Sequence, residues 1–358
     1  ILPADTAWNE APGSAAPLPA PSPGNADPDA VKRAIEALRS GEPCVILLGG
    51  GAVDEPALAL ADRIAQRTGA RVMGDTFLAR IGRGAGRVDL PRLPYFAEQA
   101  EEALAGTRHL ILVDTKAPVS FFAYPNQASE LTPEGCEVHP LVRPGEAWVP
   151  ALEAVADGVG AGQEQPRVMD LAPPGAPSGA LTAESIGQSV GALLPENAVL
   201  VNEAVTSGFA LPPMTAAAAP HDWLELTGGA IGLGLPAAVG AAIACPDRRV
   251  LALQADGSAM YTIQSLWTMA RENLDVTVVL FANRKYAILQ VEFMRVGAHN
   301  PGPKAMDMLD LSRPDLNFVD LARGMGVPAE RAVDAVSFHD ALARSFATPG
   351  PYLIETVL

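Results

Sequence analysis

Two polar segments that follow neighbouring predicted strands constrain this chain more than any other feature. The apolar stretch Val250–Leu253 predicts a short strand that runs into Asp256 of an Asp-Gly-Ser turn. The amphipathic stretch Ile263–Arg271 predicts a helix, and the β-branched run Val276–Phe281 predicts a second strand that leads to Asn283. A strand, a helix and a strand in this order form a parallel crossover. Both polar side chains are therefore expected at one carboxyl edge of a sheet, where open α/β folds bind ligands.

The residues at these strand ends favour a magnesium ion and a phosphate group. The carboxylate of Asp256 and the amide oxygen of Asn283 are hard oxygen ligands of the kind that Mg²⁺ prefers. Gly257 allows the backbone to approach a phosphate closely, and the start of the following helix favours negative charge. Asp-Gly-Ser is also common in ordinary loops, and Asn283 also suits a simple turn at a strand end. The two features, one crossover apart, together predict a site for a Mg²⁺-diphosphate.

Composition limits the class of protein and its partners. A length of 358 residues, 49% of them hydrophobic, predicts two domains with sizeable cores. The net charge of −16 argues against nucleic acid and anionic membrane surfaces as partners. The three cysteines are widely spaced without a metal-binding pattern, which indicates buried thiols in a reducing cytoplasm. No apolar run reaches about 18 residues, so a membrane span is not expected.

Alternating predicted helices and strands indicate an α/β protein with two doubly wound parallel-sheet domains. In the first domain, residues 27–165, Asp27 and Pro28 begin a helix that ends at Gly41. The further elements predicted in this domain are strands at Cys44–Leu48, Arg71–Met73 and His109–Val113 and helices near Glu55–Arg67 and Ala97–Ala105. A linker, 166–180, precedes the second domain, 181–358. The spacing of Gly49–Gly51 lacks a dinucleotide-binding fingerprint and predicts only a strand-to-helix turn.

Several segments resemble the thiamine-diphosphate enzyme superfamily. The signature of that family is Gly-Asp-Gly-Ser followed by Asn-Asn. This chain has Ala255 and Ala282 in place of the first glycine and the first asparagine, and it keeps the metal-binding members of both halves. Three further segments match the family: Gly228–Gly240, Tyr286–Leu289 and Pro351–Val357. The resemblance is to the acetolactate synthase large subunit and benzoylformate decarboxylase branch. It covers nearly all of 178–358, whereas 27–165 resembles the middle domain only in the order of elements.

The resemblance implies a set of cofactor-binding residues. Asp256, Asn283 and the backbone carbonyl of Lys285 would bind Mg²⁺, and Gly257 and Ser258 would donate to the diphosphate. Thr206 and Ser207 would add hydroxyl donors, or else only cap a loop. Gly229 would hold the pyrimidine amino group through its backbone, Ile231 would wedge under the cofactor, and Ile288 would lie along the thiazolium. The complete predicted set is Thr206, Ser207, Gly229, Ile231, Asp256, Gly257, Ser258, Asn283, Lys285, Tyr286 and Ile288.

The resemblance also implies that the chain holds only half of an active site. The glutamate that activates the cofactor in this family belongs to an N-terminal pyrimidine-binding domain, and no glutamate here is a sound substitute. Residues 1–26 are interpreted as the exit strand of such a domain followed by a linker, so the isolated chain is expected to be inactive. Glu203 and the five histidines are interpreted as structural. Ala123 takes the place of a substrate-contacting histidine, and Glu292 is expected to be solvated rather than a substrate contact.

The function favoured by these features is thiamine-diphosphate- and Mg²⁺-dependent decarboxylation of a small 2-keto acid, followed by carboligation, as in acetolactate synthase. One alternative is a decarboxylase that releases an aldehyde without ligation. The other is a cofactor-binding or assembly module that is inactive without its N-terminal domain. A homodimer or homotetramer is expected, because the family builds each site between two subunits. No residue pattern separately supports FAD, which some relatives hold.

Overall fold

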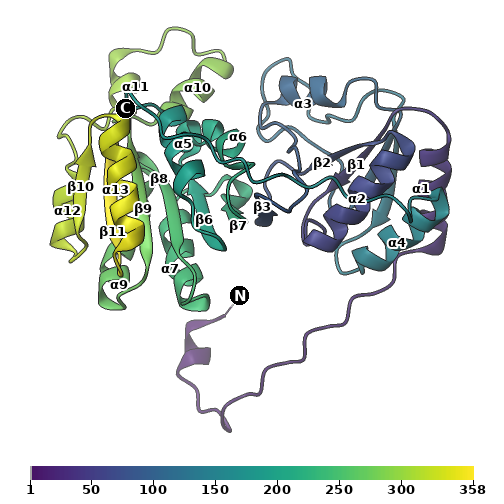
Figure 1. Cartoon of the computed structure of the whole chain (residues 1–358), viewed down its shortest axis with the longest axis horizontal. Coiled ribbons are helices and arrows are strands. Elements are labelled where there is room, and N and C mark those ends of the chain that lie inside the picture. The colour runs from purple at the N-terminus through teal and green to yellow at the C-terminus, as the bar shows by residue number, and fades with distance from the viewer. Residues whose placement is uncertain (1) are drawn as a thin grey trace.

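The computed structural model describes residues 2–358, and the first half of the chain forms a four-stranded parallel sheet (Figure 1). The strand order is β2-β1-β4-β5. The strands are β1 (Cys44–Leu48), β2 (Arg71–Gly74), β4 (His109–Val113) and β5 (Glu137–Val142). Helices α1 (Pro28–Arg39), α2 (Glu55–Thr68) and α4 (Trp148–Val159) cover one face, and α3 (Ala97–Leu104) covers the other. As predicted, Asp27 caps α1, with Pro28 in the first turn.

The second half forms six strands of a seven-stranded sheet, and the seventh strand, β3 (Arg80–Arg83), comes from the first half. The strand order is β10-β11-β9-β8-β6-β7-β3. The strands after β5 are β6 (Ala198–Glu203), β7 (His221–Glu225), β8 (Val250–Ala255), β9 (Val276–Ala282), β10 (Ala329–Ala332) and β11 (Tyr352–Val357). One face packs against α5 (Ala183–Leu193), α6 (Leu211–Thr215) and α13 (Ala335–Ala347). The other packs against α7 (Gly234–Ala244), α9 (Ser265–Arg271) and α12 (Phe318–Gly324). The predicted α/β class with two parallel-sheet domains is confirmed.

Alternation along the strands explains why the second sheet is covered on both faces. In β8, Leu251 and Leu253 face the helices α5 and α13, while Val250 and Ala252 face α7 and α9. All four side chains are fully buried. A strand that buries both faces must be apolar throughout, which is the pattern of a central parallel strand. This continuous burial fixes the carboxyl ends of β8 and β9 beside each other.

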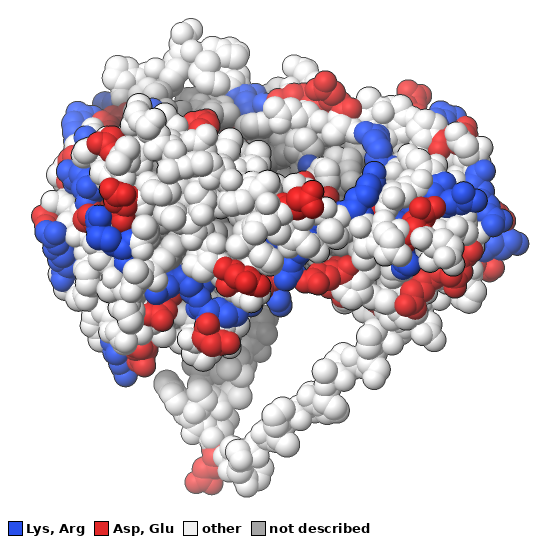
Figure 2. Space-filling view, viewed as in Figure 1, with Lys and Arg blue, Asp and Glu red and all other residues white. Residues whose placement is uncertain are grey.

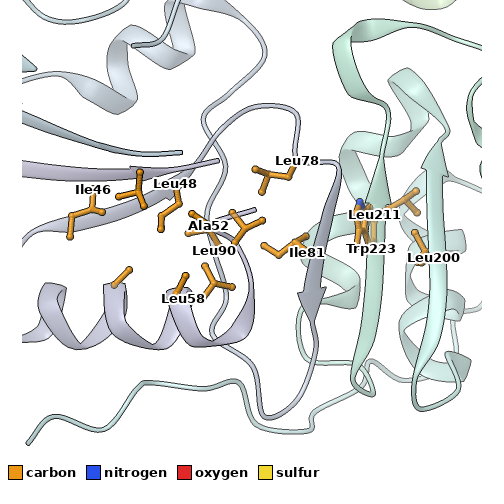
Figure 3. Packing of buried hydrophobic residues seen from close by; sticks show 14 of the residues in the cluster. Ile46, Leu48, Ala52, Leu58, Leu78, Ile81, Leu90, Leu200, Leu211 and Trp223 are labelled. Atoms are coloured by element: carbon orange, nitrogen blue, oxygen red, sulfur yellow. The ribbon is translucent and has the colours of Figure 1, made fainter. Parts of the chain in front are cut away.

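The strand β3 (Arg80–Arg83) leaves the first domain and joins the sheet of the second. It pairs antiparallel with β7, with Ile81 opposite Trp223. Figure 3 shows Ile81 between Leu90 on one side and Trp223 on the other, in one continuous apolar core. A domain boundary drawn at 27–165 therefore encloses a strand that belongs structurally to the second sheet.

The N-terminal segment differs from its prediction. Residues Ala4–Ala7 form a 3-10 turn, η1, rather than a strand, and the side chains of Leu2 and Trp8 are exposed. No neighbouring strand pairs with this segment within residues 2–358, so it has no sheet to join. Residues 11–26 carry no charge and run extended toward the first domain, where Gly24 bridges to Glu146 (Figures 1 and 2). No helix in residues 2–358 has the length and apolar character needed to cross a membrane.

Candidate functional site

The structure brings Asp256 together with the turn that contains Asn283. Because Ala255 of β8 lies opposite Phe281 of β9, the residues that follow both strands meet at one sheet edge. Oδ2 of Asp256 accepts a hydrogen bond from the backbone N–H of Arg284 at 2.6 Å. Oδ1 of Asn283 accepts from the backbone N–H of Lys285 at 3.1 Å, which tightens the same turn. The predicted juxtaposition at the carboxyl edge is thus present.

The carboxylate of Asp256 is buried without a basic partner. Only 2% of the residue is exposed, and within residues 2–358 no basic side chain forms an ion pair with it. Burial raises the pKa of Asp256, while the N–H groups of Arg284 and Gly257 act in the opposite direction. Arg284 contacts Asp256 through its backbone N–H, but its guanidinium pairs with Asp315 instead. A buried carboxylate of this kind is stabilised by a bound cation, and an oxygen donor set suits Mg²⁺.

The segment predicted as a turn begins a short helix, α8 (Asp256–Thr262). Gly257 is necessary there, because a Cβ at this position would lie 2.5 Å from Cε1 of Tyr286. The ring of Tyr286 therefore packs directly on the first turn of α8, and burial raises the pKa of its hydroxyl. Lys285 is exposed, and its backbone forms a bridge to Asp310.

The hydroxyl of Ser258 makes internal hydrogen bonds. It accepts from the side-chain amide of Gln254 at 2.6 Å and lies 3.1 Å from the carbonyl oxygen of Ala255, to which it donates. Ser258 is 3% exposed. Its side chain therefore connects the first turn of α8 to the end of β8. Its backbone N–H is the group that could donate to a phosphate.

Glu203, at the end of β6, fixes the glycine-rich segment. Its two carboxylate oxygens accept hydrogen bonds from the backbone N–H groups of Gly232 and Gly234, so the predicted structural role fits. Gly229 lies in the 3-10 turn η3 (Thr227–Gly229) with a φ of 66°, a region that favours glycine. Ile231 is half-buried and belongs to neither apolar core, so its side chain remains available for contact with a ligand.

The remaining predicted residues lie on two further elements near this edge. Thr206 and Ser207 belong to the 3-10 turn η2 (Val205–Ala210), which follows β6, and both are half-buried. Ile288 is half-buried on α10 (Ala287–Arg295), the helix that follows the Asn283 turn. Beside this turn a cavity of about 450 Å³ extends to α11 (Pro303–Asp307), with Lys285 in its wall.

An aromatic cluster from the first domain faces the glycine-rich segment and was not predicted. Its members are Phe77, Tyr95, Phe96, Phe121, Phe122 and Tyr124, and their rings contact one another. Phe121 lies against Gly229, where an added Cβ would come within 2.5 Å of its ring. The sequence contains a signal for this cluster, because aromatic residues are only 5% of the chain and these six occur in three short loop stretches of the first domain.

The environment of Glu292 differs from its prediction. It was expected as a solvated helix position, but its carboxylate accepts hydrogen bonds from the hydroxyls of Tyr95 at 3.1 Å and Tyr124 at 2.6 Å. The guanidinium of Arg295 lies 4.6 Å from the ring centre of Tyr124. Burial, then the charge of Glu292, raises the pKa of Tyr95, so its hydroxyl remains a donor. These contacts join α10 of the second domain to the first.

Comparison with known proteins shows which family the chain resembles in sequence. Residues 204–356 match the C-terminal TPP binding domain of the thiamine pyrophosphate enzymes. The chain is 53% identical over 359 residues to the "Putative acetolactate synthase large subunit IlvX" of Mycobacterium tuberculosis, which covers 100% of this chain and 69% of that protein. The benzoylformate decarboxylase of Pseudomonas aeruginosa is 32% identical over 190 residues, which cover 53% of this chain and 34% of that enzyme.

A solved structure shows the same fold. The thiamine diphosphate-dependent 4-hydroxybenzoylformate decarboxylase of Rhodococcus jostii superposes with a TM-score of 0.71 and 25% sequence identity, covering 99% of this chain and 67% of that one. The chain thus spans about two thirds of these two relatives and about one third of the Pseudomonas enzyme. The Mycobacterium tuberculosis relative matches the whole chain, and residues 204–356 match the C-terminal domain of the family. The protein therefore belongs to the thiamine pyrophosphate (thiamine diphosphate) enzyme family.

Proposed function

We propose that this chain provides the diphosphate- and Mg²⁺-binding part of an enzyme that decarboxylates a small 2-keto acid and ligates the product to a second carbonyl, as acetolactate synthase does. One observation carries the proposal: the buried carboxylate of Asp256, which pairs with no basic side chain in residues 2–358, lies against the backbone of the Asn283–Lys285 turn. The 53% identity to an acetolactate synthase-like relative supports the choice of reaction.

The residues at the sheet edge suit the bound form of the cofactor. Asp256 and Asn283 would bind Mg²⁺ through side-chain oxygens and Lys285 through its carbonyl, an all-oxygen donor set of the kind that Mg²⁺ prefers. Backbone N–H groups at Gly257 and Ser258 would donate to the diphosphate, with Thr206 and Ser207 as further donors. When bound, thiamine diphosphate supplies the carbon nucleophile and the electron sink for decarboxylation.

The chain's own residues hold and orient this cofactor. Glu203 fixes the backbone of Gly232 and Gly234, and this anchors the preceding residues Gly229 and Ile231. The half-buried side chains of Ile231 and Ile288 provide apolar contact that excludes water. The aromatic cluster closes over Gly229 from the first domain, so the two domains together shape the space above the cofactor.

The activating glutamate is assigned to a pyrimidine-binding domain outside residues 1–358, on this polypeptide or a partner. We therefore expect the 358-residue chain to bind thiamine diphosphate with Mg²⁺ without turning over substrate. Decarboxylation should appear only when that domain is supplied. Product analysis with pyruvate, alone and with a second 2-keto acid as acceptor, tests the reaction: 2-hydroxy-3-keto acids that carry the acceptor's side chain at C2 support carboligation, and an aldehyde alone contradicts it.

The aromatic cluster favours a second candidate, a decarboxylase of aromatic 2-keto acids that releases an aldehyde. Phe77, Tyr95 and Phe121 have ring centres 5.1 to 6.1 Å apart and offer flat apolar surfaces to an aryl group. The similar Rhodococcus structure is that of a 4-hydroxybenzoylformate decarboxylase, whose name gives an aromatic 2-keto acid as substrate. Faster release of benzaldehyde from benzoylformate than of any product from pyruvate would select this candidate.

Exposed apolar side chains support the proposal of a homodimer or homotetramer. The helix α7 contains no polar side chain, and Ile243 on it is 59% exposed. Trp267 on the adjacent helix α9 is 54% exposed. A helix that is apolar on all sides requires cover on all sides, and a second subunit would provide it.

A further inference from the structure

A cluster of histidine and carboxylate side chains lies at the amino edge of the first sheet. His109 begins β4, Glu137 begins β5, and His139 follows on the same face of β5. One ligand atom from each of these three residues lies within 4.8 Å of the other two. The cluster belongs to the other sheet and to the opposite strand ends from Asp256, so it forms no part of the cofactor site.

The spacing of the three ligand atoms fits a small metal ion. Nδ1 of His109 lies 3.1 Å from Nε2 of His139. Oε2 of Glu137 lies 3.8 Å from the first of these nitrogens and 3.7 Å from the second. Ligands arranged tetrahedrally about Zn²⁺ at about 2.0–2.1 Å are about 3.3 Å apart. The two nitrogens are already near that separation, and the Glu137 side chain, 72% exposed, is free to move the remaining few tenths of an ångström.

A fourth side chain fixes the tautomer of His109. Oε2 of Glu42 lies 2.9 Å from Nε2 of His109, and an ionised carboxylate can only accept a hydrogen bond. Nε2 therefore carries the proton, and Nδ1 presents a lone pair to His139 and Glu137. A carboxylate that orients a histidine in this way is the usual outer partner of a metal-bound imidazole.

The surrounding charges permit a divalent ion. Glu42 and Glu137 contribute two negative charges. Two positive charges lie nearby: Arg108 is 4.0 Å from Glu42, and Arg33 is near His139. The side chains of His109 and His139 are only 11% and 12% exposed, which restricts the movement of both rings. Because Glu137 faces solvent, a fourth coordination position is open to water.

We propose that His109, His139 and Glu137 bind a divalent transition-metal ion of the Zn²⁺ type, with Glu42 as the orienting partner of His109. The ion would join the first residues of β4 and β5 and, through Glu42, the loop before β1. It would stabilise the amino edge of the first domain independently of thiamine diphosphate.

Titration of the chelator-treated 358-residue protein with ZnCl₂ tests this site. An excess of Mg²⁺ in the buffer occupies any site at Asp256, and calorimetry then counts the remaining Zn²⁺ equivalents. We expect one equivalent, and we expect His139→Gln to weaken its binding by more than roughly 100-fold, with Glu42→Gln weakening it by about 10- to 100-fold. Bound Co²⁺ should show the intense visible absorption of a tetrahedral complex, and Zn²⁺ should raise the melting temperature of the wild type.

Two further variants keep the test decisive if a histidine variant folds poorly. Glu137→Ala changes an exposed side chain, so the fold should persist while Zn²⁺ binding is lost. Glu137→His supplies another nitrogen ligand, so binding should be retained. His299→Gln, an exposed histidine elsewhere, is the matched control and should bind one equivalent. The proposal is overturned if the wild type binds no Zn²⁺ at about tenfold excess over protein, or if Glu137→Ala and His139→Gln bind it as the wild type does.

Discussion

Two buried ionisable side chains, Asp256 and His221, affect stability in opposite directions as the pH changes. The raised pKa of Asp256 means that the folded protein holds this proton more tightly than the unfolded chain does. The contribution of Asp256 to the free energy of unfolding is therefore fully present below the ordinary aspartate pKa. It is lost as the pH rises through the higher pKa of the folded protein. A bound Mg²⁺ would compensate this loss, because it stabilises the charged form.

His221 is expected to cause loss of stability in acid. Burial lowers its pKa from 6.5 to about 4, so the folded protein binds fewer protons than the unfolded chain between these values. The stability it contributes is complete above about pH 6.5 and is lost as the pH falls toward 4, by roughly 3 kcal/mol in total. Chemical denaturation at about pH 7 and about pH 4.5 should show a smaller fall for His221→Gln than for the wild type. The exposed His299→Gln should fall as the wild type does; an equal fall in all three proteins would contradict the assignment.

Gly257 and Gly240 form a matched pair of helical glycines. In Gly257→Ala the new Cβ would meet the ring of Tyr286, which must move away from α8. We expect this variant to bind thiamine diphosphate with Mg²⁺ at least roughly tenfold more weakly. Gly240→Ala meets no atom within 4 Å and should bind normally while gaining about 0.5–1 kcal/mol of stability. Calorimetric titration of both variants checks the difference, and equal affinities would show that Tyr286 does not shape the site.

The sequence predicts individual residues well where their chemistry depends on a strand end. Asp256 and Asn283 meet because parallel strands end at the same edge, which needs no knowledge of the rest of the fold. The contacts of Glu292 depend on Tyr95 and Tyr124, which lie far away in sequence and in the other domain. The hydroxyl of Ser258 accepts a hydrogen bond from Gln254, a contact that depends on the packing of these two side chains. The Asp-Gly-Ser motif alone does not predict this contact.

At the level of elements, β3 is the connection that holds the two sheets together. Ile81 is 5% exposed in the core shared by both domains. Ile81→Ala should lower the free energy of unfolding by about 2–4 kcal/mol, because it leaves a cavity between the domains. Denaturant unfolding, followed by tryptophan fluorescence, measures this change. Val119→Ala, at a 63% exposed position, should change it by less than about 0.5 kcal/mol. Similar small changes in both variants would mean that β3 contributes little to the packing of the two domains against each other.

Local patterns predicted the elements that are long and apolar. The strands β1, β4, β8 and β9 and the helices α1 and α2 appear at the expected positions, because apolar runs and capping residues specify them. The pairing of β3 with β7 was not predictable, since the polar sequence Arg80–Arg83 becomes a strand only at the open edge beside β7. The segment Ala4–Ala7 was wrongly expected as a strand for the converse reason, because it has no sheet edge to pair with.

For the whole molecule, the exposed apolar surface of α7 and α9 predicts self-association. Ile243→Glu places a charge on that surface and should shift the protein toward the monomer in sedimentation velocity. The matched control Val333→Glu changes a 71% exposed position after β10, on another part of the second domain. It should sediment as the wild type does. A wild type that is monomeric at every concentration, or an Ile243→Glu variant that associates equally well, would contradict the proposed interface.

The most direct measurement is Mg²⁺-dependent binding of thiamine diphosphate by the wild type and Asp256→Asn, with Asp340→Asn as the control on the exposed face of α13. In the presence of Mg²⁺ we expect Asp256→Asn to bind at least roughly 100-fold more weakly than the other two proteins, and without Mg²⁺ all three should bind weakly. Equal affinity of the wild type and Asp256→Asn in Mg²⁺, or no binding by the wild type, would contradict the assignment of the cofactor site to this sheet edge.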